Sequence, residues 1–340
     1  MTRATALTDE RGGSMHGRLS RPAHNLDTRG AQTMDGMSFS EFGSVLIMQG
    51  FNGLSYFSVL LLMALGLAII FGQMGVINMA HGEFLTIGAY TTYLLSVLSA
   101  SYAPWFENYY FIAAIVVGFG VAFVIGYLVE WLMIRHLYKR PLDSLLATWG
   151  LSLIMQQTFR STFGPKEVSA TLPAWLMGSY SPKEGLDIPL NGLFVMGLTL
   201  LLTCSVAAVM FYSRWGLRVR ATTQNRAMAG AVGIDTGKID RLTFALGCGI
   251  AGVAGAAFTT IGSTGPTSGS LYIVDTFLVV VFGGAQSLLG TIASAFSIAQ
   301  TNSTLEFFMT GSTAKVITLA TIIGILMLRP EGLFRLRVRK

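Results

Sequence analysis

The 340-residue chain carries 23 Lys and Arg against 17 Asp and Glu, a formal net charge of +6, yet only 12% of its residues are charged. Its mean hydropathy is +0.59. Water-soluble proteins have about 25% charged residues. This composition argues against a soluble enzyme and against a nucleic-acid partner, and it indicates a chain surrounded by a lipid bilayer.

The first 40 residues are polar and contain no apolar stretch. They predict a disordered N-terminal tail and not a cleavable signal peptide. Nearly charge-free runs follow, and a membrane-spanning helix needs about 20 such residues. We expect spans at residues 51–72, 109–134, 144–159, 190–212, 242–262 and 312–328.

Two further stretches, 75–98 and 272–301, are apolar but interrupted by glycines and polar residues. The sequence therefore predicts an all-α integral membrane protein, a polytopic helical bundle of about eight to ten transmembrane segments, two of them interrupted. Residues 41–340 form this domain. Gly247, Ala251 and Gly255 recur every fourth residue, which predicts close helix packing inside the subunit.

Basic residues cluster in three places, 135–140, 214–241 and 329–340, whereas 99–108 contains no Lys or Arg. The positive-inside rule places the three clusters, and with them the C-terminus, in the cytoplasm. The long segment 214–241 also contains many small residues, and 227–232 predicts a short helix ending near Gly233. The segment is either a solvated basic linker or a cytoplasmic docking element.

The interruptions contain the chain's most unusual polar residues. Broken membrane helices persist only where they are buried in protein or line a wet cavity, and paired breaks point to a transporter site. The alternative is an ordinary turn between two spans, and Glu83 could be favoured by a helix N-terminus. The hypothesis is a solute pathway lined by Asn78, His81, Glu83, Thr264, Gly265, Pro266, Thr267 and Asp275.

Signatures of catalysis are missing. Residues 232–239 lack the first glycine and the Ser/Thr of a phosphate-binding P-loop, and no metal-binding or redox motif occurs. Cys204 and Cys248 are expected to be small buried hydrophobes. Ser152, in Gly-Leu-Ser-Leu, leaves an intramembrane serine protease as an alternative, which would require His81 or His136 beside it.

Several motifs occur in a fixed order: G-V-I-N-M-A-H-G-E at 75–83, Q-N-R at 224–226, G-P-T at 265–267, Y-I-V-D at 272–275 and R-P-E-G-L-F at 329–334. Over about residues 45–335 the chain resembles permeases of the branched-chain amino acid and urea class of ABC importers, and most closely the urea permease. It departs at 284–287, where the family usually has another glycine before the serine, which puts the local backbone there in doubt.

The resemblance implies a multi-pass subunit of a bacterial inner membrane. Its partners would be a second homologous permease, two cytoplasmic ATPases and a periplasmic solute-binding protein. The chain itself would bind no cofactor, because ATP and Mg²⁺ would lie on the ATPases. The segment that couples it to an ATPase would comprise Gln224, Asn225, Arg226, Ala227, Met228, Ala229, Gly233 and Ile234.

The expected solute is urea. Urea is neutral, and the residues expected at mid-membrane include Glu83 and Asp275 but no Lys or Arg, which favours a neutral solute over an amino acid. Branched-chain amino acids or short amides remain the alternative within the class. A stand-alone urea channel that needs neither ATP nor partners is the alternative outside it.

Overall fold

The computed structural model describes residues 39–102, 104–138, 140–183, 186–284 and 287–328, and those from Gly43 onward belong to one unit. Residues 1–38 of the tail expected at 1–40 and the basic cluster at 329–340 lie outside the described residues, and residues 39–40 form the start of α1. The described chain is almost entirely helical: α1 Phe39–Met74, α2 His81–Tyr102, α3 Tyr110–Leu132, α4 Pro141–Phe163, α5 Leu190–Tyr212, α6 Arg214–Gln224, α7 Arg226–Ala231, α8 Thr236–Phe258, α9 Ser268–Gly283, α10 Leu288–Phe308 and α11 Gly311–Leu328.

Within the described part of the chain, six helical segments are long and apolar enough to cross a membrane: Gly43–Met74, His81–Tyr102, Tyr110–His136, Leu190–Tyr212, Thr236–Phe258 and Gly311–Leu328. Helices α4 and α10 are also long but more polar, and α9 is a shorter apolar helix. This confirms a polytopic all-α membrane protein. Strands β1 Ser179–Lys183 and β2 Leu186–Pro189 add a small antiparallel hairpin.

Both predicted interruptions are present. Helix α1 ends at Met74, Gly75 has a φ of +64°, which favours glycine, and α2 begins only at His81. The second break separates α8 from α9 at residues 259–267, and a further break at Gly284, with φ +86°, precedes α10. The interrupted stretches are therefore separate helices joined by short irregular segments.

Helix α8 lies at the centre of the packing, because its glycines allow neighbouring backbones to touch it directly. A Cβ atom at Gly88 of α2 would lie 1.8 Å from the carbonyl oxygen of Gly252, and one at Gly255 would lie 1.9 Å from that of Leu85. Gly247 meets Gly66 of α1 in a similar way, since a Cβ atom there would lie 2.6 Å from the Gly66 carbonyl oxygen. The predicted close packing inside the subunit is confirmed.

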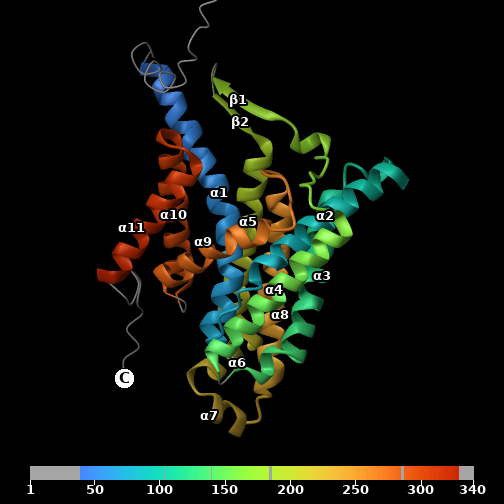
Figure 1. The fold of residues 1–340 in the computed structure, drawn as a ribbon, viewed down its shortest axis with the longest axis vertical. Helices are drawn as coiled ribbons and strands as arrows, with labels where there is room; N and C mark the ends of the chain where they lie inside the picture. Colours follow the sequence, from blue (N-terminus) through green and yellow to red (C-terminus); the bar gives the residue numbers. More distant parts are fainter. Residues whose placement is uncertain (1–38, 103, 139, 184–185, 285–286, 329–340) are drawn as a thin grey trace, which may run out of the picture. The chain divides into compact units, whose positions relative to one another are not determined.

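The segment 214–241 differs from the expected loop. It contains α6, whose N-cap Ser213 accepts a hydrogen bond from the Gly216 N–H, then α7, and then the first turns of α8. Helix α8 starts six residues before the expected span because the Asp235 carboxylate caps it by accepting from the Lys238 N–H at 3.0 Å. Helices α6 and α7 lie at one end of the bundle and the β1–β2 hairpin at the other (Figure 1).

Candidate functional site

The two interrupted segments meet where α2 and α9 begin. A Cβ atom at Gly82 would lie 2.3 Å from the carbonyl oxygen of Gly269, and one at Gly269 would lie 2.2 Å from that of Gly82. The Gly269 N–H also donates to the Thr86 hydroxyl at 3.0 Å. Two helix N-termini, each with partial positive charge, therefore cross inside the protein. Their contact explains why both breaks carry glycine.

A buried carboxylate lies at this crossing. Glu83 is 1% exposed, and its Oε1 accepts hydrogen bonds from Ser152 Oγ at 2.9 Å and from Gln156 Nε2 at 2.8 Å. Its Oε2 has no hydrogen-bond partner. Ser152 and Gln156 stand four residues apart on one face of α4. Sequence reasoning missed Gln156, and their spacing on a helix with a polar face was the available signal.

His81 and Asn78 are buried beside Glu83 in sequence and hold the start of α2. The His81 ring Nε2 lies 3.2 Å from the Met63 carbonyl oxygen, and because a carbonyl only accepts, Nε2 carries the proton. Asn78 Oδ1 accepts from the Ala80 N–H at 3.1 Å, forming a local turn before α2. Among the described residues, His81 Nδ1 and Asn78 Nδ2 are buried without a hydrogen-bond partner, as is Glu83 Oε2.

The protease alternative finds no support in these contacts. The Ser152 hydroxyl donates to Glu83, whereas His81 binds the Met63 carbonyl and His136 accepts from Arg135. Within the described residues Ser152 therefore has no histidine to act as its general base.

The second break is held by the chain's own hydrogen bonds. Thr264 and Val168 exchange two backbone hydrogen bonds of 2.8 Å, and the Gly265 N–H donates to Ser268 Oγ at 2.9 Å. Thr264, Gly265 and Pro266 are buried, whereas Thr267 is exposed. The predicted residues of this break therefore form a fixed turn, with Thr267 on its open side.

Asp275 lies in a different set of contacts. Its Oδ2 accepts from the Tyr56 hydroxyl at 2.9 Å and lies 3.1 Å from Lys315 Nζ, which also stands 5.9 Å from the centroid of the Tyr272 ring. The expectation that no Lys or Arg accompanies the pathway carboxylates is therefore wrong. Lys315 belongs to the last span, and nothing local in the sequence links it to Asp275.

A polar cavity of about 400 Å³ adjoins this ion pair through Tyr56. Glu306 lies on its wall, and the Asn302 amide donates to the Glu306 carboxylate at 3.0 Å. The remaining lining is mostly amide and hydroxyl: Gln49, Asn52, Tyr56, Ser303 and Phe307 complete it. The described groups around Tyr56 thus offer both signs of charge next to a space for a small solute.

The predicted coupling segment forms the short helix α7. Asn225 Oδ1 caps it by accepting from the Met228 N–H at 3.0 Å, and Gly233, with φ +86°, ends it. The Ile234 N–H donates back to the Ala229 carbonyl at 3.0 Å, which closes the C-terminal turn. The short helix expected at 227–232 is confirmed. Ala229 is 4% exposed, whereas Met228 is 61% exposed.

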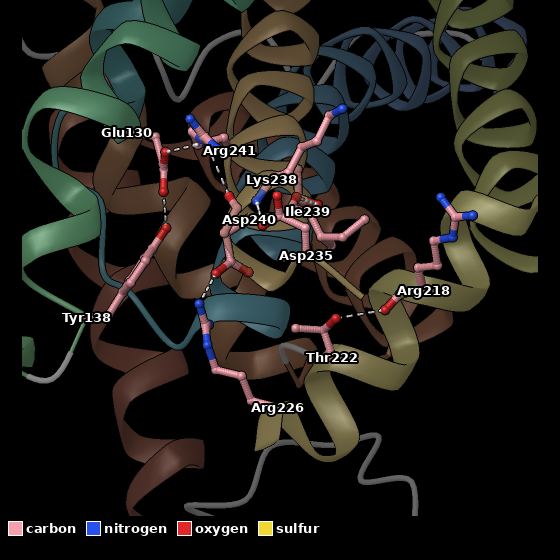
Figure 2. A network of polar contacts seen from close by, with 12 residues as sticks. Glu130, Tyr138, Arg218, Thr222, Arg226, Asp235, Lys238, Ile239, Asp240 and Arg241 are labelled. Carbon is pink, nitrogen blue, oxygen red and sulfur yellow. Dashed lines mark hydrogen bonds and ion pairs between the residues drawn. The ribbon is translucent and has the colours of Figure 1, made fainter. Parts of the chain in front are cut away.

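A polar network anchors α7 to the membrane helices (Figure 2). Arg226 pairs with Asp240 of α8 and lies 5.3 Å from the centroid of the Tyr138 ring. The Tyr138 hydroxyl donates to Glu130 of α3, whose other oxygen is 4.0 Å from Arg241 Nε. Burial, and then the bond to Glu130, raise the pKa of Tyr138. The tyrosine therefore stays a donor at all physiological pH values.

Comparison with known proteins gives a consistent result. The family model described as "Branched-chain amino acid transport system / permease component" matches residues 50–326. The branched-chain amino acid permease LivH of Salmonella typhimurium is 26% identical over 298 residues, covering 84% of this chain and 94% of LivH. BraD of Pseudomonas aeruginosa is 26% identical over 295 residues, covering 84% and 95%.

A more distant similarity reaches the ribose import permease RbsC of Escherichia coli, which is 26% identical over 285 residues, covering 80% of this chain and 82% of RbsC. No solved structure matches the chain significantly.

Proposed function

The chain belongs to the family of branched-chain amino acid transport system permease components, and on that premise we propose that it forms the solute path of an ATP-driven importer. The observation that supports this path is the crossing of α2 and α9 at Gly82 and Gly269. Irregular backbone inside a membrane protein occurs where it lines a path or is covered by protein. Glu83 and the nitrogens without partners of Asn78 and His81 belong to the segment that leads into this crossing.

Branched-chain amino acids are the solute class that this proposal favours. The printed names of LivH and BraD refer to them. An amino acid zwitterion needs a cation for its carboxylate and an anion for its ammonium group. Lys315 and Asp275 form an ion pair beside Tyr56, and Glu306 lines the cavity. Lys315 beside Asp275 is a cation of the kind whose expected absence favoured a neutral solute.

Urea is the second candidate, and one observation favours it. Around Glu83 the described donors are the Ser152 hydroxyl and the Gln156 amide. The Asn78 and His81 nitrogens without partners are uncharged hydrogen-bonding groups, which would suit a small planar diamide. The signature at 75–83, which resembles that of the urea permease, points the same way.

The proposed partners are a second homologous permease, two cytoplasmic ATPases that hold ATP and Mg²⁺, and a periplasmic solute-binding protein, all at a bacterial inner membrane. Exposed Arg214, Arg218 and Lys238 lie on α6 and α8, and the positive-inside rule assigns such residues to the cytoplasm. Helix α11 runs toward the end of the bundle where α6 lies (Figure 1). This direction supports a cytoplasmic C-terminus.

The decisive experiment is uptake of labelled leucine and labelled urea, measured in parallel in cells with and without this chain, the rest of the importer being present. Urea is kept at micromolar concentration so that passive leak is small. We expect leucine uptake to be lost on deletion. Loss of urea uptake alone would establish the second candidate, and unchanged uptake of both would remove both solutes. Urea flux through the purified chain alone, without ATP, would instead establish a channel.

Met228 provides a test of ATPase docking. Its side chain is 61% exposed on α7, and a carboxylate there would enter any apolar groove that receives the helix. Central interface residues contribute about 2 kcal/mol or more, or about 30-fold in affinity. We therefore expect Met228→Glu to reduce by that factor the amount of ATPase subunit that co-purifies with a tagged chain.

The control is Tyr180→Glu, because Tyr180 is 61% exposed on β1, at the opposite end of the bundle. It should retain the ATPase fully. Equal ATPase recovery with both variants would contradict docking through α7.

A further inference from the structure

Asp240 is buried although it lies only four residues after the start of α8. Its side chain is 1% exposed, and Arg226 of α7 is its ion-pair partner. Burying a carboxylate is costly, and a buried ion pair contributes little more stability than an apolar pair of the same size. The best-attested role of such pairs is to fix the register of one element on another. The Arg226–Asp240 pair therefore fixes the position of α7 on α8.

Arg226 is held from a second direction as well. Its guanidinium lies over the Tyr138 ring, and Tyr138 donates to the buried Glu130 of α3 (Figure 2). Arg241, one residue after Asp240, is the ion-pair partner of the same Glu130. Among the described residues, Arg226 is the one side chain of α7 in an ion pair with the bundle. A displacement of α7 must therefore either break this pair or move α8 and the end of α3.

Helix α8 connects this end of the bundle to the crossing of α2 and α9. Its Gly252 and Gly255 touch the α2 backbone with no side chain between them, and Gly88 completes the contact. Side chains can absorb a small shift by changing rotamer, but two touching backbones cannot, and close-packed interiors transmit strain. A shift of α8 is therefore passed to α2, whose first turn carries Glu83.

We propose that the Arg226–Asp240 ion pair transmits movement of α7 to the solute path, with Asp240 as the positioning residue that makes α7 and α8 move as one body. This inference rests on the proposed function as an ATP-driven permease. It assigns to Asp240 neither contact with solute nor contact with an ATPase. Its loss should lower the solute transported per ATP hydrolysed without abolishing ATP hydrolysis.

The test uses the complete importer reconstituted in proteoliposomes, with the solute identified by uptake in cells. Asp240→Asn keeps the size of the side chain and removes the charge, whereas Asp240→Glu keeps the charge. We expect Asp240→Asn to assemble and hydrolyse ATP while solute transported per ATP falls by about 5- to 150-fold, the range of typical coupling between sites. Asp240→Glu should restore much of the solute transported per ATP. Amide hydrogen exchange in α7 should rise in Asp240→Asn.

Lys238→Gln is the matched control, because Lys238 is exposed on the same turn and has no ion pair among the described residues. The solute that this variant transports per ATP hydrolysed should equal that of the wild type. An unchanged ratio in Asp240→Asn, or equal losses of uptake and ATP hydrolysis, would overturn the inference.

If Asp240→Asn fails to assemble, Arg226→Gln decides, because it removes the other charge of the ion pair. A normal ratio in that variant overturns the inference, and a lowered ratio supports it. Failure of the proposed function looks different, because the wild-type importer would then transport no solute.

Discussion

Gly88→Ala is expected to destabilise the folded protein strongly. The new methyl group would lie 1.8 Å from the carbonyl oxygen of Gly252, a backbone atom that can move only with the whole of α8. Overpacking a well-filled interior costs about 1–3 kcal/mol, occasionally more, and this contact belongs to the upper part of that range. The thermal unfolding midpoint of the purified protein in detergent should fall clearly.

Gly120→Ala is the matched control for this substitution. Gly120 lies in α3, and no atom lies within 4 Å of the position that its Cβ would occupy. Because alanine favours a helix over glycine by about 1 kcal/mol, this variant should be as stable as the wild type or slightly more so. Equal midpoints for the two variants would show that α2 and α8 do not touch through their backbones.

Glu83→Leu is expected to abolish uptake and to lower stability. It leaves the Ser152 hydroxyl without its acceptor, whereas the Gln156 amide keeps Ser152 Oγ at 3.0 Å. A buried group that loses its partner costs about 1–3 kcal/mol. Glu83→Gln keeps an acceptor oxygen of the same size. It should therefore fold and elute as the wild type does, while uptake falls because the charge at the start of α2 is lost.

Thr158→Val serves as the control on the same helix, since Thr158 is exposed and its hydroxyl donates only to the Ile154 carbonyl of its own helix. Uptake and elution profile are compared for the three variants. If Glu83→Gln and Glu83→Leu each retained wild-type uptake, the solute path would lie elsewhere. The cavity at Tyr56 would then be the next site to test.

The sequence predicts the spans well where hydrophobicity alone decides. Residues 190–212 are expected as a span and form α5 with these bounds, because the run is uniformly apolar and begins directly after Pro189. Helix α6 was missed because its many arginines suggest a loop. Ser213, which caps α6 by accepting from the Gly216 N–H at 2.9 Å, was the local signal for a helix start.

The candidate site is predictable only in part. The motif at 75–83 identifies Asn78, His81 and Glu83, because polar residues inside an apolar run stand out locally. Their partners do not stand out. Gln156 is 73 residues from Glu83, and a serine or glutamine on a helix has many possible environments. The Asp275–Lys315 pair illustrates the same limit, since its members belong to α9 and α11 and only the packing of those helices brings them together.

The position of α2 has a consequence for how the protein is made. The hydroxyl of Thr86, a residue of α2, accepts a hydrogen bond from the Gly269 N–H, which lies 183 residues later in the chain. A ribosome adds about 5–20 residues per second, so roughly ten to forty seconds pass before that partner is synthesised. During this interval α4 and then α8 are synthesised, whereas α9 is still missing. The crossing of α2 and α9 therefore forms only after most of the chain has been made, and Gly82 and Thr86 lack their α9 partner until then.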